Sequence, residues 1–305
     1  MSYADLVFKK NVFDILADGV STEGQDVRAK WADGTPAYTI EKFSIVNEYD
    51  LSKEFPIMTL RKTAFKSCID EMLWIYQKQS NNVKDLNSHI WDQWADENGS
   101  IGRAYGYQIG TEYYENIDDG KKEDFKDFYL NHSIHSKENT GDDYVNNKLN
   151  QIDWAIWKLM YDRSNRRNII NMYNLKDLEY MHLYPCAFGL MLNVTGEILN
   201  ATLLQRSQDF LTANNWNIVQ YAVLMHMLAQ VSGLKVGKLV HVINNAHIYD
   251  RHIEQVKELV SREPLPAPKF EMNPDIKNFY DFTVDDFKLI GYESHPQIKN
   301  IEVAI

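Results

Sequence analysis

Residues 215–231 limit the possible folds more than any other segment of the chain. They read NWNIVQYAVLMHMLAQV, which would place apolar side chains on almost every side of a helix. A helix that is apolar nearly all round must be covered by other elements on all sides. The sequence therefore predicts a buried central helix. It also predicts a buried amide near the start of that helix, Asn217, which needs a hydrogen-bond partner.

The rest of the pattern predicts strands and flanking helices in a mixed order. Strands are expected at 167–175, 187–194, 197–207 and 239–243, with another after the turn-rich segment 25–40. Thr195 and Gly196 form the turn between the second and third of these strands. Helices are expected at 3–18, 63–77 and 248–262. Because strands and helices do not alternate regularly, we expect an α+β fold with a mixed β-sheet packed against the long buried helix and the flanking helices.

Residues 111–150 differ in composition from the rest of the chain. They are acidic, polar and poor in aliphatic side chains. They are not rich enough in Gly, Pro or Ser to act as a flexible linker. We therefore expect a polar surface insertion with short helices, carried by a single domain that spans residues 1–305.

Composition excludes several classes of protein. The 305 residues include 43 acidic and 32 basic side chains, giving a net charge of −11, which argues against nucleic-acid binding. The two cysteines, Cys68 and Cys186, are too few for a disulfide scaffold or a four-thiol metal site. No segment approaches the roughly 20 apolar residues needed to cross a bilayer, and the N-terminus does not resemble a signal peptide. We expect a cytoplasmic protein that binds no membrane.

The common short motifs of enzymes are missing from the sequence. It contains no P-loop, no dinucleotide-binding glycine motif, no G-x-S-x-G and no H-E-x-x-H. His132 and His135 are three residues apart, but they lie in the polar insertion and are not expected to bind a metal. We predict no metal site.

Cys186 is the candidate nucleophile. It lies in the segment Leu183–Ala187, between a polar turn and a strand, and Arg206 follows twenty residues later. A neighbouring arginine can lower the pKa of a thiol and increase the thiolate fraction. A lone cysteine is more often a small buried hydrophobic residue. Without further information that interpretation is favoured for Cys186, and still more for Cys68.

Long blocks of the sequence resemble the thymidylate synthase family. The blocks are FPIMTLRKTAFKSCIDEMLW, HIWDQWADENGSIGRAYGYQ, SNRRNII, LYPCA, LLQRSQDF, WNIVQYAVLMHMLAQ, HIYDRHIEQ, REPLPAPKF and DFTVDDFKLIGYESHPQIK. They occur in the family's order and spacing and leave mainly 111–150 uncovered. The resemblance implies a homodimer that joins through a face of the sheet and converts dUMP to dTMP by reductive methylation. The co-substrate would be 5,10-methylenetetrahydrofolate, the donor of the one-carbon group and the hydride.

The resemblance also implies catalytic roles for matching residues. Cys186 would add to C6 of the uracil ring, which makes C5 nucleophilic and splits a difficult step into easier ones. Glu71 would organise water and relay protons, and Tyr105 would lie near the nucleophile. Arg206 and Asp209 complete the implied catalytic set.

Substrate and folate contacts are implied in the same way. The dUMP phosphate would be held by Arg28, Arg206, Ser207, and Arg166 with Arg167 of the partner subunit. Guanidinium groups suit phosphate because they donate two parallel hydrogen bonds. The nucleoside would be held by Asn217, at the uracil amide edge, and by His247 and Tyr249, at the 3′-hydroxyl. The folate would contact Ile90, Trp91, Trp94, Asp209 and the C-terminal Ile305.

Each of these residues also has a purely structural interpretation. Arg166 and Arg167 could form a solvated surface pair. Glu71 could belong to a buried salt bridge. Asn217 could be a helix-start residue satisfied by the backbone, and the tryptophans could be core residues.

Four places depart from the family pattern. Ala187 follows the nucleophile where the family usually has His, and Ile109 stands where Trp is common. Residues 211–215, which include Ala213, replace a glycine-containing loop, and residues 243–246, which include Asn245, stand where the family usually has two glycines and an acid before His247. Loss of glycine where the backbone approaches a ligand would alter the fit of the folate.

Two other functions remain open at this stage. A dUMP hydroxymethylase of the same family would share the early steps and let water, rather than hydride, attack the methylene intermediate. A nucleotide-binding or RNA-binding homodimer without catalysis would have no need of Cys186, Arg206 and Glu71, so their presence argues against it.

Overall fold

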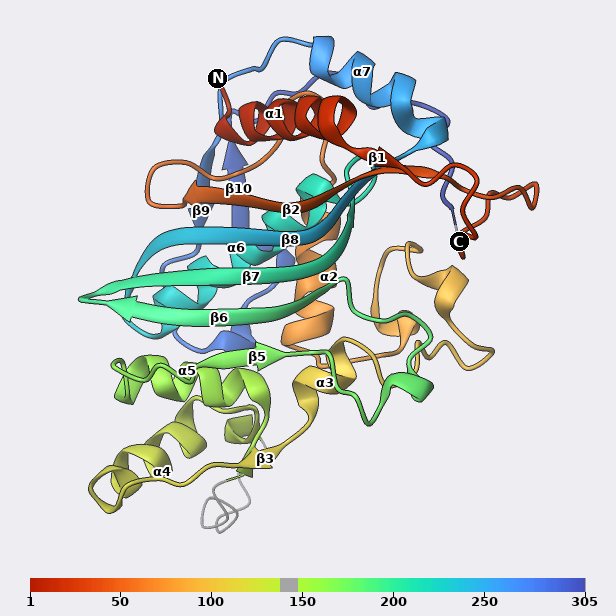
Figure 1. The fold of residues 1–305 in the computed structure, drawn as a ribbon. Coiled ribbons are helices and arrows are strands. Elements are labelled where there is room, and N and C mark those ends of the chain that lie inside the picture. The colour runs from red at the N-terminus through yellow and green to blue at the C-terminus, as the bar shows by residue number, and fades with distance from the viewer. Residues whose placement is uncertain (138–147, 305) are drawn as a thin grey trace.

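A six-stranded mixed sheet forms the centre of the computed structural model, which describes residues 1–137 and 148–304 (Figure 1). Its strand order is β1-β2-β8-β7-β6-β5. The bounds are β1 Val20–Ser21, β2 Thr39–Asp50, β5 Ile169–Asn171, β6 Ala187–Thr195, β7 Ile198–Asp209 and β8 Lys235–Tyr249. β7 and β8 run parallel, and the other neighbours are antiparallel. The prediction of an α+β fold with a mixed sheet is confirmed.

The predicted central helix is α6, Asn214–Val231, which connects β7 to β8. It contacts both of these strands and the helix α2, Phe65–Tyr76. Both helices lie behind the sheet in Figure 1. Its apolar side chains from Ile218 to Val231 are buried on all sides, which confirms the expectation from its composition. No helix in the described ranges is long and apolar enough to cross a membrane.

Other helices and two small sheets surround this core. Along the β1–β2 edge lie α1, Tyr3–Asp18, and α7, Ile253–Ser261 (Figure 1). On the β5 side lie α3 Gly106–Gly110, α4 Lys122–Asn131 and α5 Gln151–Tyr161. The small sheets pair β3 Tyr113–Tyr114 with β4 Lys148–Leu149, and β9 Lys269–Met272 with β10 Phe287–Ile290. Short 3₁₀ helices occupy Val83–Asp85, Asp92–Trp94, Asp119–Lys121, Ile134–Lys137, Leu178–Tyr180, Asp250–His252, Phe279–Asp281 and Val284–Asp286.

Three predicted elements differ clearly from the structure in their bounds. The strand expected at 239–243 is the longer strand β8, Lys235–Tyr249. The strand expected at 167–175 is limited to Ile169–Asn171, because only these residues pair with β6. The helix expected from 248 begins at Ile253, because β8 continues to Tyr249, where it pairs with Thr39 of β2. Pairing with β2 therefore overrides the helical pattern at this boundary.

The polar segment 111–150 contains the short helix α4, as expected. Phe125 and Phe128 of this helix are buried in the main core, and α4 contacts α5. The segment therefore contributes to the core as well as to the surface. Residues 138–147 lie outside the described residues.

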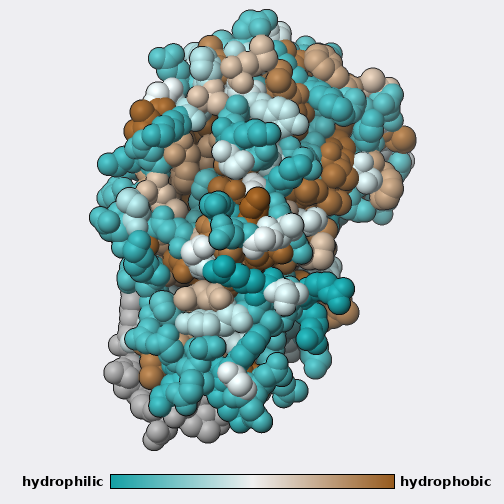
Figure 2. Space-filling view, turned by 90° about the vertical axis from the view of Figure 1, so that its left-hand side faces the viewer, coloured by the Kyte–Doolittle hydropathy of each residue, from teal (hydrophilic) through white to brown (hydrophobic). Residues whose placement is uncertain are grey.

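The face of the sheet turned away from α6 carries two apolar rows. Strand pairing aligns Ile169, Met191, Thr202 and Val240 in one row. It aligns Val46, Val242 and Leu204 in the next. Ile169, Met191 and Val46 are exposed. Apolar side chains accordingly gather toward the right of Figure 2, the side that faces the viewer in Figure 1.

Candidate active site

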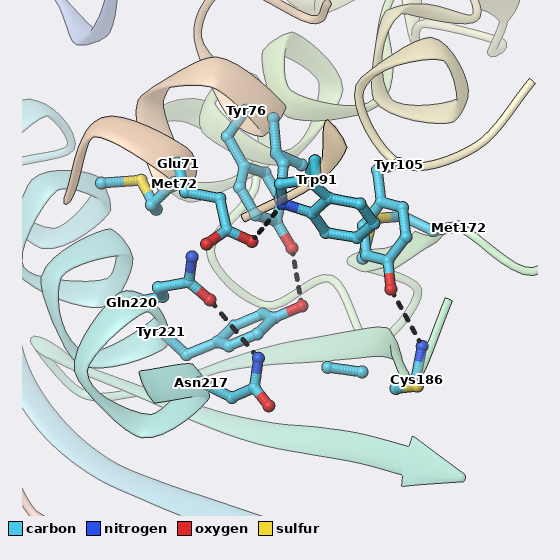
Figure 3. A pocket seen from close by; sticks show the side chains of 12 residues that line it. Glu71, Met72, Tyr76, Trp91, Tyr105, Met172, Cys186, Asn217, Gln220 and Tyr221 are labelled. Atoms are coloured by element: carbon cyan, nitrogen blue, oxygen red, sulfur yellow. Dashed lines mark hydrogen bonds between the residues drawn. The ribbon is translucent and has the colours of Figure 1, made fainter. Parts of the chain in front are cut away.

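A cavity lies between the start of β6, the helices α2 and α6, and the loop residues around Trp91 and Tyr105 (Figure 3). Its lining residues are Glu71, Met72, Ile75, Tyr76, Trp91, Tyr105, Met172, Cys186, Ala187, Asn217, Gln220 and Tyr221. Five of the predicted site residues line it together: Glu71, Trp91, Tyr105, Cys186 and Asn217. The structure thus brings together side chains that are far apart in the sequence.

Cys186 is half-buried at the entry to β6, beside Arg206 of β7. The antiparallel pairing of β6 with β7 brings the two residues together, and the Arg206 amide donates to the Cys186 carbonyl at 2.8 Å. Nη2 of Arg206 lies 3.6 Å from Sγ of Cys186. The guanidinium also donates to the carbonyls of Pro185 and Tyr184, at 3.0 and 2.6 Å. Arg206 therefore stabilises the turn that carries the thiol of Cys186.

Burial and positive charge act in opposite directions on this thiol. Burial raises the pKa of Cys186, while the positive charges of Arg206 and Arg28 lower it. The net pKa is above the ordinary value. Arg206 lowers the pKa of Cys186, as predicted, but in the single chain burial raises that pKa by more.

Glu71 is buried on α2 and its carboxylate is held by two indoles. Nε1 of Trp91 donates to one oxygen at 3.0 Å, and Nε1 of Trp216 donates to the other at 2.5 Å. Burial raises the pKa of Glu71 to about 7, although these hydrogen bonds lower it. The carboxyl group can therefore take up or release a proton near neutral pH. The salt-bridge interpretation of Glu71 is wrong, because its partners in the described chain are neutral donors.

Asn217 belongs to a chain of side-chain amides beneath the cavity. Its Oδ1 accepts from Nε2 of Gln205 at 3.2 Å. Its Nδ2 donates to Oε1 of Gln220 at 3.4 Å (Figure 3). Gln205 in turn is hydrogen-bonded to Nε2 of His241 at 2.8 Å. These contacts to side chains replace the backbone contacts expected of a simple helix-start asparagine. The amide plane is held in place facing the cavity.

The partners of Asn217 were not singled out from the sequence. Gln220 offered a signal, because it is a polar residue three positions after Asn217 in an apolar helix. Gln205 and His241 offered none, since alternating polar residues in a strand are ordinary. Trp216, the second partner of Glu71, also looked like a core residue.

Tyr105 connects the loop region to the nucleophile. Its hydroxyl accepts a hydrogen bond from the Cys186 amide at 3.3 Å, and its ring packs edge-on against Trp91 at 4.7 Å. The backbone of Tyr105 has φ 49° and ψ −106°, a conformation that residues other than glycine rarely adopt. A Cβ at the next residue, Gly106, would lie 2.0 Å from the Ser80 carbonyl. Strain of this kind is characteristic of functional sites.

Asp209 and His247 lie opposite each other on β7 and β8. The Asp209 carboxylate accepts from the Leu211 amide at 2.8 Å and from the Thr212 hydroxyl at 2.6 Å, and so closes the turn that leads to α6. Burial lowers the pKa of His247, whose Nδ1 lies 2.8 Å from Oδ1 of Asn245. Tyr249 packs edge-on against His247 at 5.1 Å.

The predicted phosphate ligands do not all converge in one chain. Arg28 is exposed, but its charge lowers the pKa of Cys186 and of Tyr249, so it faces the same region. Ser207 is half-buried on β7, next to Arg206. Arg166 and Arg167 are exposed and do not line the cavity that holds Cys186. Arg166 instead lines a hollow on the outer face of the sheet, with Met191, Thr202 and Val240.

Of the predicted folate contacts that the structure describes, only Trp91 lines the cavity. Trp91 is buried, packs against the half-buried Trp94 at 5.4 Å and lines the cavity, while Ile90 is exposed. Ile305 lies outside the described residues. Among the described residues, no group of three or more His, Cys, Asp or Glu side chains is arranged to hold a metal ion.

One departure from the family pattern, the loop at 211–215, has a physical explanation. Residues 211–215 have no left-handed backbone, so the loop does not require glycine. It is held instead by Asn215, which accepts from the Met58 amide at 2.9 Å and donates to the Pro56 carbonyl at 3.1 Å. Ala187 is buried and lines the cavity beside the nucleophile.

Comparisons with known proteins agree along the whole chain. The family model described as thymidylate synthase matches residues 6–305. The thymidylate synthase of Bacillus subtilis subsp. natto is 38% identical over 309 residues, covering 100% of both chains. That of Clostridium beijerinckii is 40% identical over 259 residues, covering 83% of this chain and 84% of the relative. The solved thermostable thymidylate synthase A from Bacillus subtilis superimposes with a TM-score of 0.85 at 38% identity, covering 100% of both chains.

Proposed function

The chain belongs to the thymidylate synthase family, and from that membership we propose how its own residues carry out the reaction. Its activity is that of a thymidylate synthase, a methyltransferase that forms dTMP. The proposal concerns the roles of individual residues, the co-substrate and the subunit arrangement. The observation that carries it is the 3.6 Å approach of Arg206 to the sulfur of Cys186 in a cavity that also holds Glu71.

Cys186 provides the nucleophile. Its thiolate forms a bond to C6 of dUMP, and the C5–C6 π electrons move toward the O4 oxygen to give an enolate. C5 then attacks the one-carbon group that 5,10-methylenetetrahydrofolate supplies. Loss of the C5 proton and elimination of the folate amine leave an exocyclic methylene, and transfer of a hydride from tetrahydrofolate accompanies cleavage of the S–C6 bond. The products are dTMP and dihydrofolate.

Glu71 donates and accepts the protons that are transferred in these steps. A carboxyl group with a pKa of about 7 exchanges protons with water readily at neutral pH. Its indole partners fix both oxygens beside the cavity, so the group stays in place when its charge changes. Tyr105, which contacts the Cys186 amide, is close enough to the nucleophile to take part.

Asn217 selects the pyrimidine. An amide offers one donor and one acceptor, which match O4 and N3–H of uracil. Its hydrogen bonds to Gln205 and Gln220 support a fixed orientation of the donor and acceptor. Cytosine presents the opposite pattern at the same edge, so this orientation favours dUMP.

Two subunits complete the phosphate site. The outer face of the sheet carries exposed apolar side chains, including Val46 and Met191, which suit burial in a homodimer. Arg166 lines the hollow on this face, so it is well placed to reach a partner subunit. The guanidinium groups of Arg166 and Arg167 would then join Arg28, Arg206 and Ser207 of the other chain around the phosphate.

The folate occupies the aromatic side of the cavity. The fused ring of Trp91 and its neighbour Trp94 offer an apolar surface for a flat pterin, and this fits the chemistry of the group. Asp209 contributes a carboxylate for pterin nitrogen atoms. The residues that end in Ile305 cover the bound ligands and exclude water, which protects the methylene intermediate.

An assay of both products tests the proposal. The purified protein is incubated with dUMP and 5,10-methylenetetrahydrofolate, and the folate and nucleotide products are followed by absorbance and mass spectrometry. Formation of dTMP and dihydrofolate in equal amounts is expected. Hydroxymethyl-dUMP with tetrahydrofolate retained would assign the chain to hydroxymethylation, and no turnover of either kind would refute the proposed roles.

A further inference from the structure

A chain of three polar side chains runs from β2 through β8 to the edge of the proposed nucleotide site. Oε2 of Glu41 accepts a hydrogen bond from Nδ2 of Asn245 at 2.8 Å. Oδ1 of Asn245 lies 2.8 Å from Nδ1 of His247. The strand register explains the arrangement, because Glu41 lies directly opposite His247 in the β2–β8 ladder.

The carboxylate at one end determines the direction of every hydrogen bond in this chain. An ionised carboxylate only accepts hydrogen bonds, so the amino group of Asn245 must face Glu41. The carbonyl oxygen of Asn245 must then face His247. Because that oxygen also only accepts, Nδ1 of His247 must carry the proton, and in a neutral imidazole Nε2 is then an acceptor.

The surroundings favour the neutral imidazole. His247 is 8% exposed, and burial lowers its pKa. The charged and titratable groups around it are Asp209 and Glu41, which raise its pKa, and His252, which lowers it. Tyr249 contributes a ring edge at 5.1 Å.

We propose that Glu41 is a positioning residue that acts through Asn245 to fix the Nδ1–H tautomer of His247, so that Nε2 accepts the hydrogen bond of a nucleotide 3′-hydroxyl. This inference rests on the proposed function, in which His247 holds that hydroxyl. The stretch before His247, residues 243–246, lacks the acid of the family pattern, and here the negative charge is supplied by Glu41 of the neighbouring strand. The site consequently requires a hydroxyl donor at the 3′ position of its nucleotide.

A double-mutant cycle between Glu41 and Asn245 tests the coupling. Asn245→Asp places two carboxylates side by side, and at pH 8 the KM for dUMP is expected to rise about tenfold. Glu41→Gln keeps an acceptor for Asn245, so KM is expected to change by less than about threefold. In the double variant the amide of Gln faces the carboxylate of Asp, and KM is expected to return to within about threefold of the original value. Additive losses in the double variant would overturn the proposal.

A control and a direct spectroscopic readout accompany the cycle. Glu197→Gln removes the same charge from an exposed surface pair with Lys235 and is expected to leave KM unchanged. With ¹⁵N-labelled histidine, the ring nitrogen shifts of His247 are expected to show Nδ1–H in the unmodified protein and a mixture of tautomers in Glu41→Leu. An Nε2–H tautomer in the unmodified protein would overturn the proposal.

The substrate requirement is tested with a nucleotide that lacks the 3′-hydroxyl donor. Both 2′,3′-dideoxy-UMP and 3′-O-methyl-dUMP are expected to bind at least about tenfold more weakly than dUMP, because Nε2 loses its donor. Equal affinity for the 3′-O-methyl compound would overturn the proposal. Since the NMR measurement needs no turnover, a protein with the expected tautomer but no activity on dUMP would refute the proposed function separately.

Discussion

Nη2 of Arg206 lies 3.6 Å from Sγ of Cys186, yet the thiol has a pKa above its ordinary value because burial outweighs the nearby charge. Burial in the single chain therefore favours the protonated thiol over the thiolate. The two arginines that we propose come from the partner subunit would add positive charge at this place. Additional positive charge would favour the thiolate of Cys186.

Replacing Arg206 should make the thiol less reactive. In Arg206→Leu the cation that lowers the pKa of Cys186 is lost, so the pH profile of iodoacetamide alkylation at Cys186 should move to higher pH. We expect kcat/KM for dUMP to fall by at least about a hundredfold, because the phosphate also loses a bidentate donor. Cys68 is fully buried and should not react. Lys235→Leu, on the exposed surface, is the control, and an unchanged alkylation profile in Arg206→Leu would contradict the assigned role.

Glu71 should give the enzyme a pH dependence near neutrality. In Glu71→Gln we expect kcat to fall by about a hundredfold or more, with little change in dUMP binding, because the proton relay is lost. The change of kcat with pH near pH 7 should be absent from the pH profile of Glu71→Gln. A variant that keeps both kcat and this pH dependence would show that Glu71 is only structural.

The same residue should affect folding stability. The pKa of Glu71 is about 7 in the folded chain against an ordinary value of 4.5, so the folded state holds the proton more tightly. The protonated carboxyl group contributes fully to the free energy of unfolding below pH 4.5, and this contribution is lost as the pH rises through 7. The free energy of unfolding falls by up to ~3 kcal/mol over this range. Denaturant unfolding of the unmodified protein and of Glu71→Gln is measured between pH 4.5 and 8. The free energy of unfolding should fall with rising pH by this amount only in the unmodified protein.

Asn217 should determine which pyrimidine is accepted. Asn217→Asp replaces the amide donor by a second acceptor, which suits the amino group of cytosine better than O4 of uracil. We expect the ratio of kcat/KM for dUMP to that for dCMP to fall by at least about a hundredfold. Gln220→Asn, which changes only a neighbour of Asn217, is a matched comparison. An unchanged ratio in Asn217→Asp would remove the role of this residue in base selection.

Mixed subunits should test the shared site. Arg166→Ala/Arg167→Ala and Cys186→Ala should each be inactive as homodimers. After unfolding and refolding together, mixed dimers would contain one complete site, with the thiol from one chain and the arginines from the other. We expect about a quarter of the unmodified activity, because half of the dimers are mixed and each has one site. No recovery would show that the arginines act within their own chain.

The neighbourhood of Cys186 could be predicted from the sequence, but the environment of Glu71 could not. The turn at Thr195 and Gly196 fixes the pairing of β6 with β7, and this pairing brings Arg206 beside the nucleophile. The two indoles that hold Glu71 come from positions 20 and 145 residues away, and no local pattern contains such contacts. The position of Glu71 within an apolar helix did nevertheless indicate a buried carboxyl group.

Long-range packing also explains the errors. The start of α7 was placed too early because the sequence near Tyr249 fits a helix, whereas pairing with β2 keeps Ile248 and Tyr249 in β8. Whether the pKa of Cys186 is raised or lowered depends on how deeply the thiol is buried. The pattern of charges in the sequence does not reveal this. The link from Glu41 through Asn245 to His247 requires the register of two distant strands, in which Glu41 and Asn245 are 204 residues apart along the chain.

Trapping of the covalent intermediate tests the central claim most directly. The protein is incubated with 5-fluoro-dUMP and 5,10-methylenetetrahydrofolate, digested, and analysed by mass spectrometry, with Cys186→Ala as the control. Fluorine at C5 cannot leave as a proton does, so the reaction should stop with both ligands attached to the peptide that contains Cys186. An intact, unmodified Cys186 peptide from protein that binds both ligands would contradict the mechanism.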